Sequence, residues 1–387
     1  MRILFSASKY PHGGNQFTAF IKVLCEEMTR QGNEVSVITP QSISRAMLKG
    51  EKLLPLEMTY DIETPVGTKK IAVYRPWTIS FGFGRIGRQT LIWDRWFFKR
   101  FIFKRKIDFD VVYAHFWRSA FKIVPVAQKY NKKLIVATGE DVININKYID
   151  ARETEELKKS VSGVICVSTK NKEESIKLGL TTGENCIVLP NSTDQTLFHP
   201  QNQIECRKLL GFPENSFIVA FCGRFNKRKG ANRVSDAIKR LNDKDIKVVF
   251  IGRDVENQHL EIDCPGILFK GQLPHEQIPV YLGAADVYVL PTMAEGCSNS
   301  IVEALSCGLP VISSKLPFNY DILSDKNSIM VDPMDVEAIS KAIRNIKEDV
   351  SYRNYLRDGA VESGRNLNIE NRTKKILSFI TDIINEK

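Results

Sequence analysis

The stretch Asp286-Val-Tyr-Val-Leu290-Pro-Thr-Met-Ala-Glu295-Gly-Cys-Ser-Asn-Ser300-Ile-Val-Glu303-Ala-Leu-Ser-Cys-Gly308-Leu-Pro310 decides the fold of this chain. Its first five residues predict a buried strand, and a helix is expected to open at about Ser300 after a turn of Gly, Ser and Asn. Such a turn aims backbone N–H groups at one point, which suits a phosphate. Glu303 offers two acceptor oxygens for a pair of sugar hydroxyls. A helix start with an acidic first turn explains the same pattern structurally.

Short Val/Ile-rich strands alternate with helices along the whole chain. The expected strands are Arg2–Ala7, Glu34–Thr39, Asp110–Ala114, Lys133–Thr138, Gly163–Ser168 and Cys186–Leu189, then Phe217–Gly223, Lys247–Gly252, Ile267–Lys270, Asp286–Leu290, Pro310–Ser313 and Ser328–Val331. The expected helices are Asn15–Gln31, Arg88–Lys104, Ser119–Tyr130, Thr169–Leu178, Ala231–Leu241, Ser300–Cys307 and Val336–Ile346. This alternation predicts an α/β fold with parallel sheets covered on both faces.

The alternation breaks at residues 190–200, a polar segment bounded by prolines, and starts again near Ser216. We therefore expect a doubly wound, Rossmann-like domain over residues 1–195 and a second over residues 196–365. A final segment, residues 366–387, contains a helix that is expected to cross back to the first domain. Two such domains joined by a linker are expected to face each other across a cleft between the C-terminal ends of their strands. That end of a doubly wound sheet is its usual ligand site.

Composition narrows the class of protein. The 387 residues are 43% hydrophobic and 26% charged, as in an ordinary globular protein of two domains. No run of about 18 apolar residues predicts a membrane-spanning helix. The eight cysteines form no CxxC pair, so neither zinc nor disulfides are expected and the reducing cytoplasm fits best.

The net charge of +10 favours an anionic partner. Residues 77–106 hold eight Arg/Lys and nine Phe/Trp but one acid, Asp94. On a helical wheel, Arg88, Arg95 and Lys99 form one stripe, which predicts docking on an anionic membrane surface at the inner face of the cell membrane. Burial of the same helix under residues 81–87 is the alternative. On charge alone, phosphorylated substrates and nucleic acid are also compatible.

A basic segment follows the first strand of the second half: Gly223-Arg224-Phe-Asn-Lys-Arg-Lys229-Gly230. Arg224 lies just past the expected strand end, and Lys229 follows five residues later. After the intervening turn, both side chains can reach the same ligand. Arg224 and Lys229 therefore suit a diphosphate, Arg as a bidentate fork and Lys as a point charge. A solvated basic loop is the structural alternative.

Weaker signals lie in the first half. Gly13 and Gly14 follow the first strand, where glycine lets the backbone approach a ligand. His115 ends another strand and is the best candidate there for contact with a reacting sugar. Residues 82–87 match GxGxxG, but no strand runs straight into the first glycine, so we discount a dinucleotide site. The Asp108-Phe-Asp110 pattern, similar to a metal-binding DxD, is interpreted as structural.

Together these motifs resemble the retaining, nucleotide-sugar-dependent glycosyltransferases of family 4, which have the GT-B fold. Glu295 and Glu303 match the family's E-x7-E element, and the resemblance spans nearly the whole chain. It implies that Arg224 and Lys229 hold the donor diphosphate, that Glu303 binds the ribose, and that Glu295 and the following turn face the donor sugar. The implied turn residues are Gly296, Cys297, Ser298, Asn299 and Ser300. The resemblance also implies donor-side roles for His115, Gly13 and Gly14, and an acceptor-side role for Asp141.

Three positions depart from the family pattern. Thr138 replaces a histidine, Ser192 replaces a glycine, and Ser298-Asn299 stands where many members have Gly-Leu or Pro-Asn. The first two weaken inference about acceptor binding and hinge geometry.

The expected activity is transfer of a hexose from a nucleotide-diphospho-sugar to a hydroxyl of a saccharide or lipid-linked saccharide, in cell-surface polysaccharide or glycolipid synthesis. Neither a metal nor another cofactor is expected, and nucleic acid is not expected as a partner. A nucleotide-sugar 2-epimerase, a dehydrogenase that uses residues 82–87, and a non-catalytic nucleotide-binding protein are the alternatives.

Overall fold

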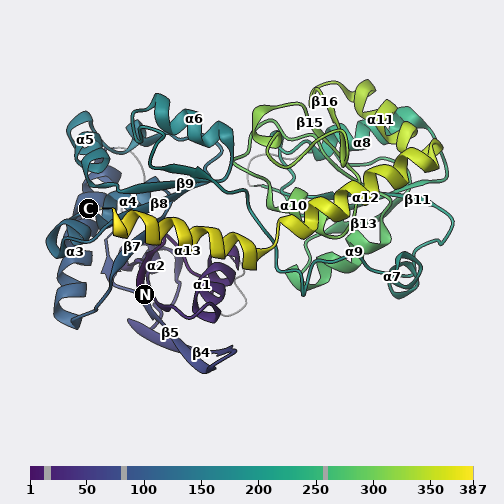
Figure 1. Ribbon diagram of the computed structural model, residues 1–387. Coiled ribbons are helices and arrows are strands. Elements are labelled where there is room, and N and C mark those ends of the chain that lie inside the picture. Colours follow the sequence, from purple (N-terminus) through teal and green to yellow (C-terminus); the bar gives the residue numbers. More distant parts are fainter. Residues whose placement is uncertain (13–18, 80–84, 256–259, 387) are drawn as a thin grey trace. The chain divides into compact units, whose positions relative to one another are not determined.

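The computed structural model describes residues 1–12, 19–79, 85–255 and 260–386. The chain divides into two compact units (Figure 1). The first unit contains Met1–Leu189 and Arg372–Lys387, and the second contains Pro190–Asn371. Each unit is built on one sheet with helices packed against it.

The sheet of the first unit has the strand order β10-β9-β8-β7-β1-β2-β5-β4. All neighbours are parallel except β4 and β5, which form an antiparallel hairpin at one edge. Every residue of β7 and β8 is buried, so both faces of the sheet are covered there, as apolar strand sequences predict. The strands are β1 (Arg2–Ser6), β2 (Glu34–Ile38), β4 (Glu57–Thr64), β5 (Gly67–Tyr74), β7 (Val111–His115), β8 (Leu134–Thr138), β9 (Gly163–Cys166) and β10 (Cys186–Val188).

Helices and two short strands complete the first unit. The strands β3 (Gln41–Ser42) and β6 (Trp77–Thr78) pair in parallel beyond the main sheet. Helices α3 and α4 pack together over one face, with Phe98, Trp117 and Phe121 in the core between them and the sheet. The helices are α1 (Ala19–Arg30), α2 (Ile43–Lys49), α3 (Arg85–Arg105), α4 (Trp117–Tyr130), η1 (Ile145–Lys147), α5 (Ala151–Ser160) and α6 (Thr169–Lys177).

The sheet of the second unit has the order β13-β12-β11-β14-β15-β16, all parallel. Numbered within the unit, this is the order 3-2-1-4-5-6 of a doubly wound Rossmann sheet, and its order reverses between β11 and β14. The strands are β11 (Phe217–Cys222), β12 (Ile246–Ile251), β13 (Ile267–Gly271), β14 (Val287–Leu290), β15 (Val311–Ser314) and β16 (Ser328–Val331). The two sheets confirm the predicted α/β class with two doubly wound units.

Helix α8 illustrates why the helices of the second unit form where they do. Ala231, Val234, Ala237 and Ile238 recur at helical spacing and are all buried. The helices are α7 (Gln203–Leu210), α8 (Ala231–Leu241), η2 (His275–Gln277), α9 (Ile278–Ala284), α10 (Asn299–Ser306), η3 (Pro317–Asn319), α11 (Val336–Glu348) and α12 (Val350–Asn366). A last helix, α13 (Ile369–Asn385), begins in the second unit and belongs to the first unit from Arg372 onward.

The expected boundary after residue 195 moves to Leu189, because residues 190–195 bond to the second unit. Thr193 N donates to the carbonyl oxygen of Leu367 over 3.0 Å, and Ile369 N donates to that of Thr193 over 2.9 Å. Gln195 Nε2 donates to the carbonyl oxygen of Gly364 over 2.6 Å.

A first prediction concerns Gly252, which follows β12 and has φ of +156°. A Cβ there would lie 1.9 Å from the carbonyl oxygen of Gly223, whose amide donates to Ile251 O over 2.9 Å. Gly252→Ala should therefore cost at least about 3 kcal/mol, from overpacking and backbone strain together. Gly211 is the matched control, with φ of +67° but open space around its Cβ position.

Gly211→Ala should cost only about 1–2 kcal/mol. Urea unfolding followed by circular dichroism compares the two variants. Equal shifts in the unfolding midpoint would show that the contact with Gly223 does not limit this position.

Candidate active site

Two neighbouring strands of the second sheet end where the expected donor residues begin. β11 and β14 lie side by side at the point where the strand order reverses, the usual ligand site of doubly wound sheets. Residues 223–230, the basic loop, follow β11, and residues 291–298, the Glu295 loop, follow β14. A hydrogen bond of 2.9 Å from Met293 N to the carbonyl oxygen of Arg228 joins the two loops.

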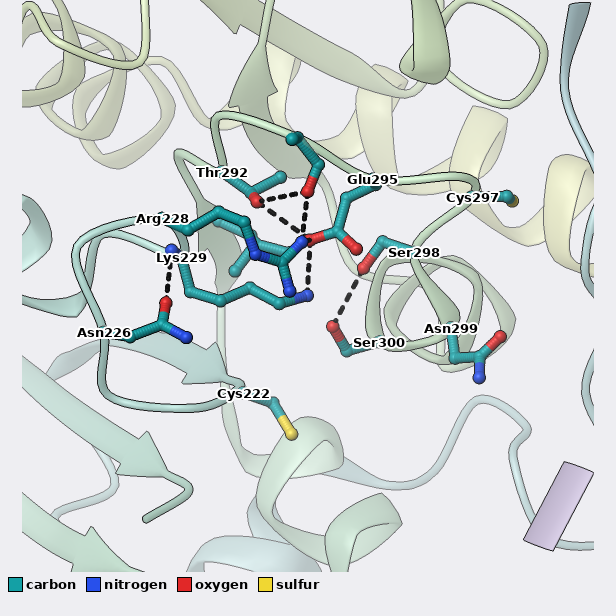
Figure 2. A network of polar contacts seen from close by, with 12 residues as sticks. Cys222, Asn226, Arg228, Lys229, Thr292, Glu295, Cys297, Ser298, Asn299 and Ser300 are labelled. Carbon is teal, nitrogen blue, oxygen red and sulfur yellow. Dashed lines mark hydrogen bonds and ion pairs between the residues drawn. The ribbon is translucent and has the colours of Figure 1, made fainter. Parts of the chain in front are cut away.

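Lys229 and Glu295 form the centre of this edge (Figure 2). The ammonium nitrogen of Lys229 lies 2.5 Å from Glu295 Oε1, and the guanidinium of Arg228 lies 3.4 Å from the same oxygen. The hydroxyl of Thr292 donates to that oxygen over 2.8 Å. The Glu295 side chain is only 8% exposed, so these partners hold a largely desolvated carboxylate in one orientation. Two cations and one carboxylate thus share the carboxyl end of the sheet.

Arg233, in the first turn of α8, holds the basic loop in shape. Its buried guanidinium donates to the carbonyl oxygens of Lys227, over 2.8 Å, and Pro291, over 2.6 Å. It therefore ties the loop after β11 to the loop after β14. Gly230 has φ of +80°, and a Cβ there would lie 2.4 Å from Arg233 Nη2. Arg233 could not be identified from the sequence, because a cation inside an amphipathic helix belongs to no motif.

Gly223 and Arg224 follow β11 directly. Gly223 packs beside Gly252, and the side chain of Arg224 is exposed on the basic loop that also carries Lys229. The next residue, Phe225, is buried and anchors the loop to the sheet. The structure thus places both expected diphosphate-binding cations on one anchored loop.

Glu303 lies in α10 and pairs with a residue that sequence analysis did not identify. Its Oε1 lies 3.0 Å from Nε2 of His275 in η2, and the His275 ring packs against Phe198 with 5.1 Å between ring centroids. Burial lowers the pKa of His275, but the hydrogen bond to Glu303 and the charges of Glu303 and Glu276 outweigh it, so that the pKa is raised above 6.5. Only proximity in the fold reveals His275.

The turn between Glu295 and α10 is held by the side chain of Asn191. Its Nδ2 donates to the carbonyl oxygen of Cys297 over 2.9 Å and to Oδ1 of Asn299 over 2.7 Å. The hydroxyls of Ser298 and Ser300 lie 3.2 Å apart. All the expected turn residues therefore lie on one braced segment: Gly296, Cys297, Ser298, Asn299 and Ser300.

His115 lies at the carboxyl end of β7 in the first unit, beside β1. Its buried ring contacts Phe116 and Phe20, with centroids 4.2 and 5.2 Å away. Burial, together with the charge of Arg372, lowers the pKa of His115 to about 3, so the imidazole is neutral at pH 7. Within the described residues neither ring nitrogen has a hydrogen-bond partner. A neutral ring can donate from one nitrogen and accept at the other.

Glu140 and Asp141 follow β8, and the acceptor-side role of Asp141 stays a prediction. Glu140 accepts from Trp117 N over 3.1 Å and from the Thr138 hydroxyl over 2.6 Å, and so caps α4. Burial raises the pKa of Glu140 despite these hydrogen bonds. Asp141 is contacted at its backbone oxygen by the Lys170 ammonium over 2.5 Å. Gly13, Gly14 and residues 82–84 lie outside the described residues.

The predicted membrane stripe on α3 is wrong at Arg95. The guanidinium of Arg95 lies 2.6 Å from Glu156 and 4.4 Å from the centroid of the Phe121 ring, and the side chain is only 14% exposed. The helix turns Arg95 inward because α4 and α5 cover that side. The side chain of Arg88 lies outside the described residues. Lys99 is exposed, on an outward face that we name the aromatic face: Ile92, Trp93, Trp96, Lys99, Arg100, Phe103 and Lys104.

Over the part of the chain that the structure describes, two further features are absent. There, no three His, Cys, Asp or Glu side chains gather as metal ligands would. Over the same residues, no helix is both long and apolar enough to span a bilayer.

Comparison with known proteins identifies the family of both units. The model of "Glycosyltransferase Family 4" matches residues 18–197, and that of "Glycosyl transferases group 1" matches residues 202–362. A Bacillus subtilis glycosyltransferase named for teichuronic acid biosynthesis, TuaC, is 27% identical over 94% of this chain and 93% of its own.

A second relative and a solved structure agree with this identification. The Escherichia coli UDP-Gal:alpha-D-GlcNAc-diphosphoundecaprenol alpha-1,3-galactosyltransferase is 26% identical over 59% of this chain and 62% of its own. Sucrose-phosphate synthase from Thermosynechococcus elongatus superposes with a TM-score of 0.77 at 20% identity, covering 100% of this chain and 99% of that one. Its fold, GT-B, is therefore the fold of this chain. Because the two family models together span nearly the whole of it, the chain belongs to glycosyltransferase family 4 and is a hexosyltransferase-type enzyme.

Proposed function

We propose that the chain transfers a hexose, with retention, from a nucleotide-diphospho-sugar to a hydroxyl of a saccharide or lipid-linked saccharide. The observation that carries the donor assignment is the contact between Lys229 and Glu295 at the switch point of the second sheet. A cation and a carboxylate held together there suit the two ends of the bond that breaks, the phosphate oxygen and the anomeric carbon.

Each donor group has a residue suited to it. Arg224 and Lys229 would hold the diphosphate, Glu303 would accept from the ribose hydroxyls, and Glu295 with the turn braced by Asn191 would face the sugar. The His275 contact occupies one oxygen of Glu303 and leaves the other for a hydroxyl. Because these cations can balance the diphosphate charge, we propose that turnover needs neither a metal nor another cofactor.

Charge builds up on the departing phosphate in the difficult step, so preorganised cations accelerate it most. In the mechanism we propose, the bond from the anomeric carbon to the phosphate oxygen breaks while the acceptor oxygen bonds to the same face of that carbon. The acceptor proton passes to the departing phosphate. Glu295 would stabilise the positive charge that develops on the sugar, and the neutral ring of His115 would donate a hydrogen bond to a hydroxyl of that sugar.

The names of relatives suggest the acceptor. The Bacillus subtilis relative is named for teichuronic acid biosynthesis, and the Escherichia coli one acts on a diphosphoundecaprenol-linked sugar. We propose a related role in cell-surface polysaccharide or glycolipid synthesis at the cytoplasmic side of the membrane.

A panel of UDP-, GDP-, ADP- and CMP-sugars tests the donor assignment. One of them should raise the melting temperature of the protein and be hydrolysed slowly without acceptor. If the protein instead epimerises the sugar of that donor, it is a 2-epimerase. If no nucleotide-sugar binds, the proposed function fails.

Replacing Lys229 should slow the chemical step. Lys229→Ala removes a cation from the leaving phosphate and should lower kcat about 10²–10³-fold at saturating donor, with EDTA present throughout. Lys227→Ala is the matched control, since Lys227 lies on the same loop but its side chain is exposed. Near-normal kcat for Lys229→Ala, or equal losses in both variants, would contradict the assignment.

The pair of His275 and Glu303 should make stability depend on pH. The folded-state pKa of His275 is raised, so its contribution is present below pH 6.5 and is lost as pH rises through the folded pKa. The free energy of unfolding of wild type minus that of His275→Gln should therefore fall between pH 5.5 and pH 9. The opposite contribution of His115, whose pKa is lowered, cancels in this difference.

Glu303→Gln provides the control, because it removes the charge that His275 faces. Its stability should not fall over this pH range, because burial lowers the pKa of His275 once the charge of Glu303 is gone. Identical profiles for all three proteins would mean that the pair does not form.

We further propose that the aromatic face of α3 attaches the enzyme to an anionic membrane. Trp96 and Phe103 are 57% and 59% exposed, and the guanidinium of Arg100 lies 5.4 Å from the centroid of the Trp96 ring. Exposed rings beside cations suit an interface where rings enter the acyl boundary and charges meet headgroups. This face replaces the stripe of Arg88, Arg95 and Lys99.

Vesicle co-sedimentation tests this attachment. At about 1 kcal/mol per cation near an anionic surface, changing Lys99, Arg100 and Lys104 to Glu should abolish binding to phosphatidylglycerol vesicles and spare donor hydrolysis. The control changes three exposed lysines of the second unit to Glu, and should still bind: Lys244, Lys315 and Lys326. Failure of the wild type to sediment at low salt would rule out the membrane role.

A further inference from the structure

Arg75 is a buried cation at the carboxyl end of the first sheet. It follows β5 directly, and its backbone N donates to the carbonyl oxygen of Leu56 over 2.7 Å. The residue is 2% exposed. Among the described residues, nothing accepts a hydrogen bond from either Nη atom of its guanidinium. Burial removes most of this guanidinium from solvent, so a ligand that accepts from its Nη atoms would offset the cost of burying them.

Two other buried arginines show how this protein normally treats such a group. Arg207 donates to the carboxylate of Asp286 over 2.7 Å and to the carbonyl oxygen of Ala284 over 2.9 Å. Both Nη atoms of Arg233 donate to backbone carbonyls. Arg75 differs from both, although it is the least exposed of the three. Each buried polar group without a partner in a native protein calls for an explanation, and a ligand is one.

The position of Arg75 favours a ligand. Ser6, Ile38 and Tyr74 lie on one line across β1, β2 and β5, so these strands end together just before Arg75. This is the carboxyl edge of a doubly wound sheet, where ligands bind. The hydroxyl of Ser6 and both ring nitrogens of His115, at the same edge, also lack partners within the described residues.

The surroundings of Arg75 indicate the charge of that ligand. Among the described residues, Tyr10 is the titratable group that raises the pKa of Arg75, and the Tyr10 hydroxyl is hydrogen-bonded to that of Tyr60. Burial lowers the pKa of Arg75 more than Tyr10 raises it. Across the described residues no carboxylate forms an ion pair with Arg75. An anion would supply both the opposite charge and the hydrogen-bond acceptors for Arg75.

We propose that Arg75 binds an anionic group of the acceptor, a phosphate or a carboxylate. A guanidinium pairs with either in a planar, two-bonded geometry that an ammonium cannot reproduce. Because the residue is 2% exposed, the acceptor reaches it by displacing side chains that cover it. The acceptor role rests on the proposed transferase function, and the anion site itself does not.

Stability distinguishes a ligand-binding role from a structural one. Arg75→Met removes an unpaired buried charge, so its melting temperature should equal or exceed that of the wild type. Arg207→Met is the matched control. It removes a buried charge that is paired with Asp286, and so should lower the melting temperature by about 4 °C or more. A comparable loss, or failure to fold, for Arg75→Met would make Arg75 structural and overturn the proposal.

Titration calorimetry with inorganic phosphate and with glucuronate tests the anion site. The protein carries Arg224→Ala and Lys229→Ala, so that the donor site does not bind the probe. One of the two anions should bind. Arg75→Met should lower the affinity for that anion at least about tenfold, whereas Arg75→Lys should keep part of the affinity. The anion that binds tells a phosphate-bearing acceptor from a carboxylate-bearing one. Absence of binding, or unchanged affinity in Arg75→Met, overturns the inference.

Hydrolysis of the donor without acceptor separates this inference from the proposed function. Arg75→Met, with Arg224 and Lys229 intact, should hydrolyse the donor at the wild-type rate. If hydrolysis stays normal but Arg75→Met leaves the anion affinity unchanged, only the inference fails. If the wild type uses no nucleotide-sugar, the transferase function fails, and the calorimetry still decides the anion site.

Discussion

The donor side of this protein depends on the pairing of β11 with β14. Val219 and Ala220 pair with Val287 and Tyr288, so both strands deliver their loops to the same edge. Asp286 secures this junction, because its carboxylate accepts from Ile218 N and from the Arg207 guanidinium, each over 2.7 Å. Beyond the strand ends Arg233 joins the two loops again. Lys229 meets Glu295 because the chain is fixed on both sides of them.

Positive charge serves distinct purposes in different parts of the molecule. Three arginines make contacts within the fold and contribute little to the attraction of a partner: Arg95, Arg207 and Arg233. Lys229 is shared between the fold and the reaction, since the carboxylate that orients it also faces the donor sugar in the proposed mechanism. In the roles proposed above, the exposed cations of the aromatic face and the Nη atoms of Arg75 bind partners. A net charge of +10 therefore says less about function than the places where charge lacks a counterion.

Much of the fold, and the grouping of Lys229 with Glu295 at one edge of a sheet, could be predicted from the sequence, because both depend on local patterns. Apolar runs identified the central strands, Lys229 and Glu295 lie in the loops after two of them, and Glu303 lies in the helix that follows the second loop. The β4–β5 hairpin was missed, since most residues of β4 remain at least partly exposed and give it a weak apolar pattern. Helix α12 was missed as well, because few of its residues are buried.

His275, Arg233 and Arg75 were also missed, for a different reason. Each is defined by contacts, or by a lack of them, with residues distant in sequence. The error at Arg95 has the same origin, because a helical wheel cannot say which side Glu156 will cover. Contacts between residues that are distant in the sequence cannot be predicted from a single sequence.

The division of α13 between the units has a consequence for biosynthesis. Ile376, Ile380 and Ile383 are buried, and Phe379 lies against Gly163, so this helix completes the core of the first unit. During translation the second unit emerges while the first still exposes the apolar surface that this helix will cover. The first unit thus finishes folding after the second has been synthesised, and residues 1–189 made alone would leave that surface open to aggregation and chaperone binding.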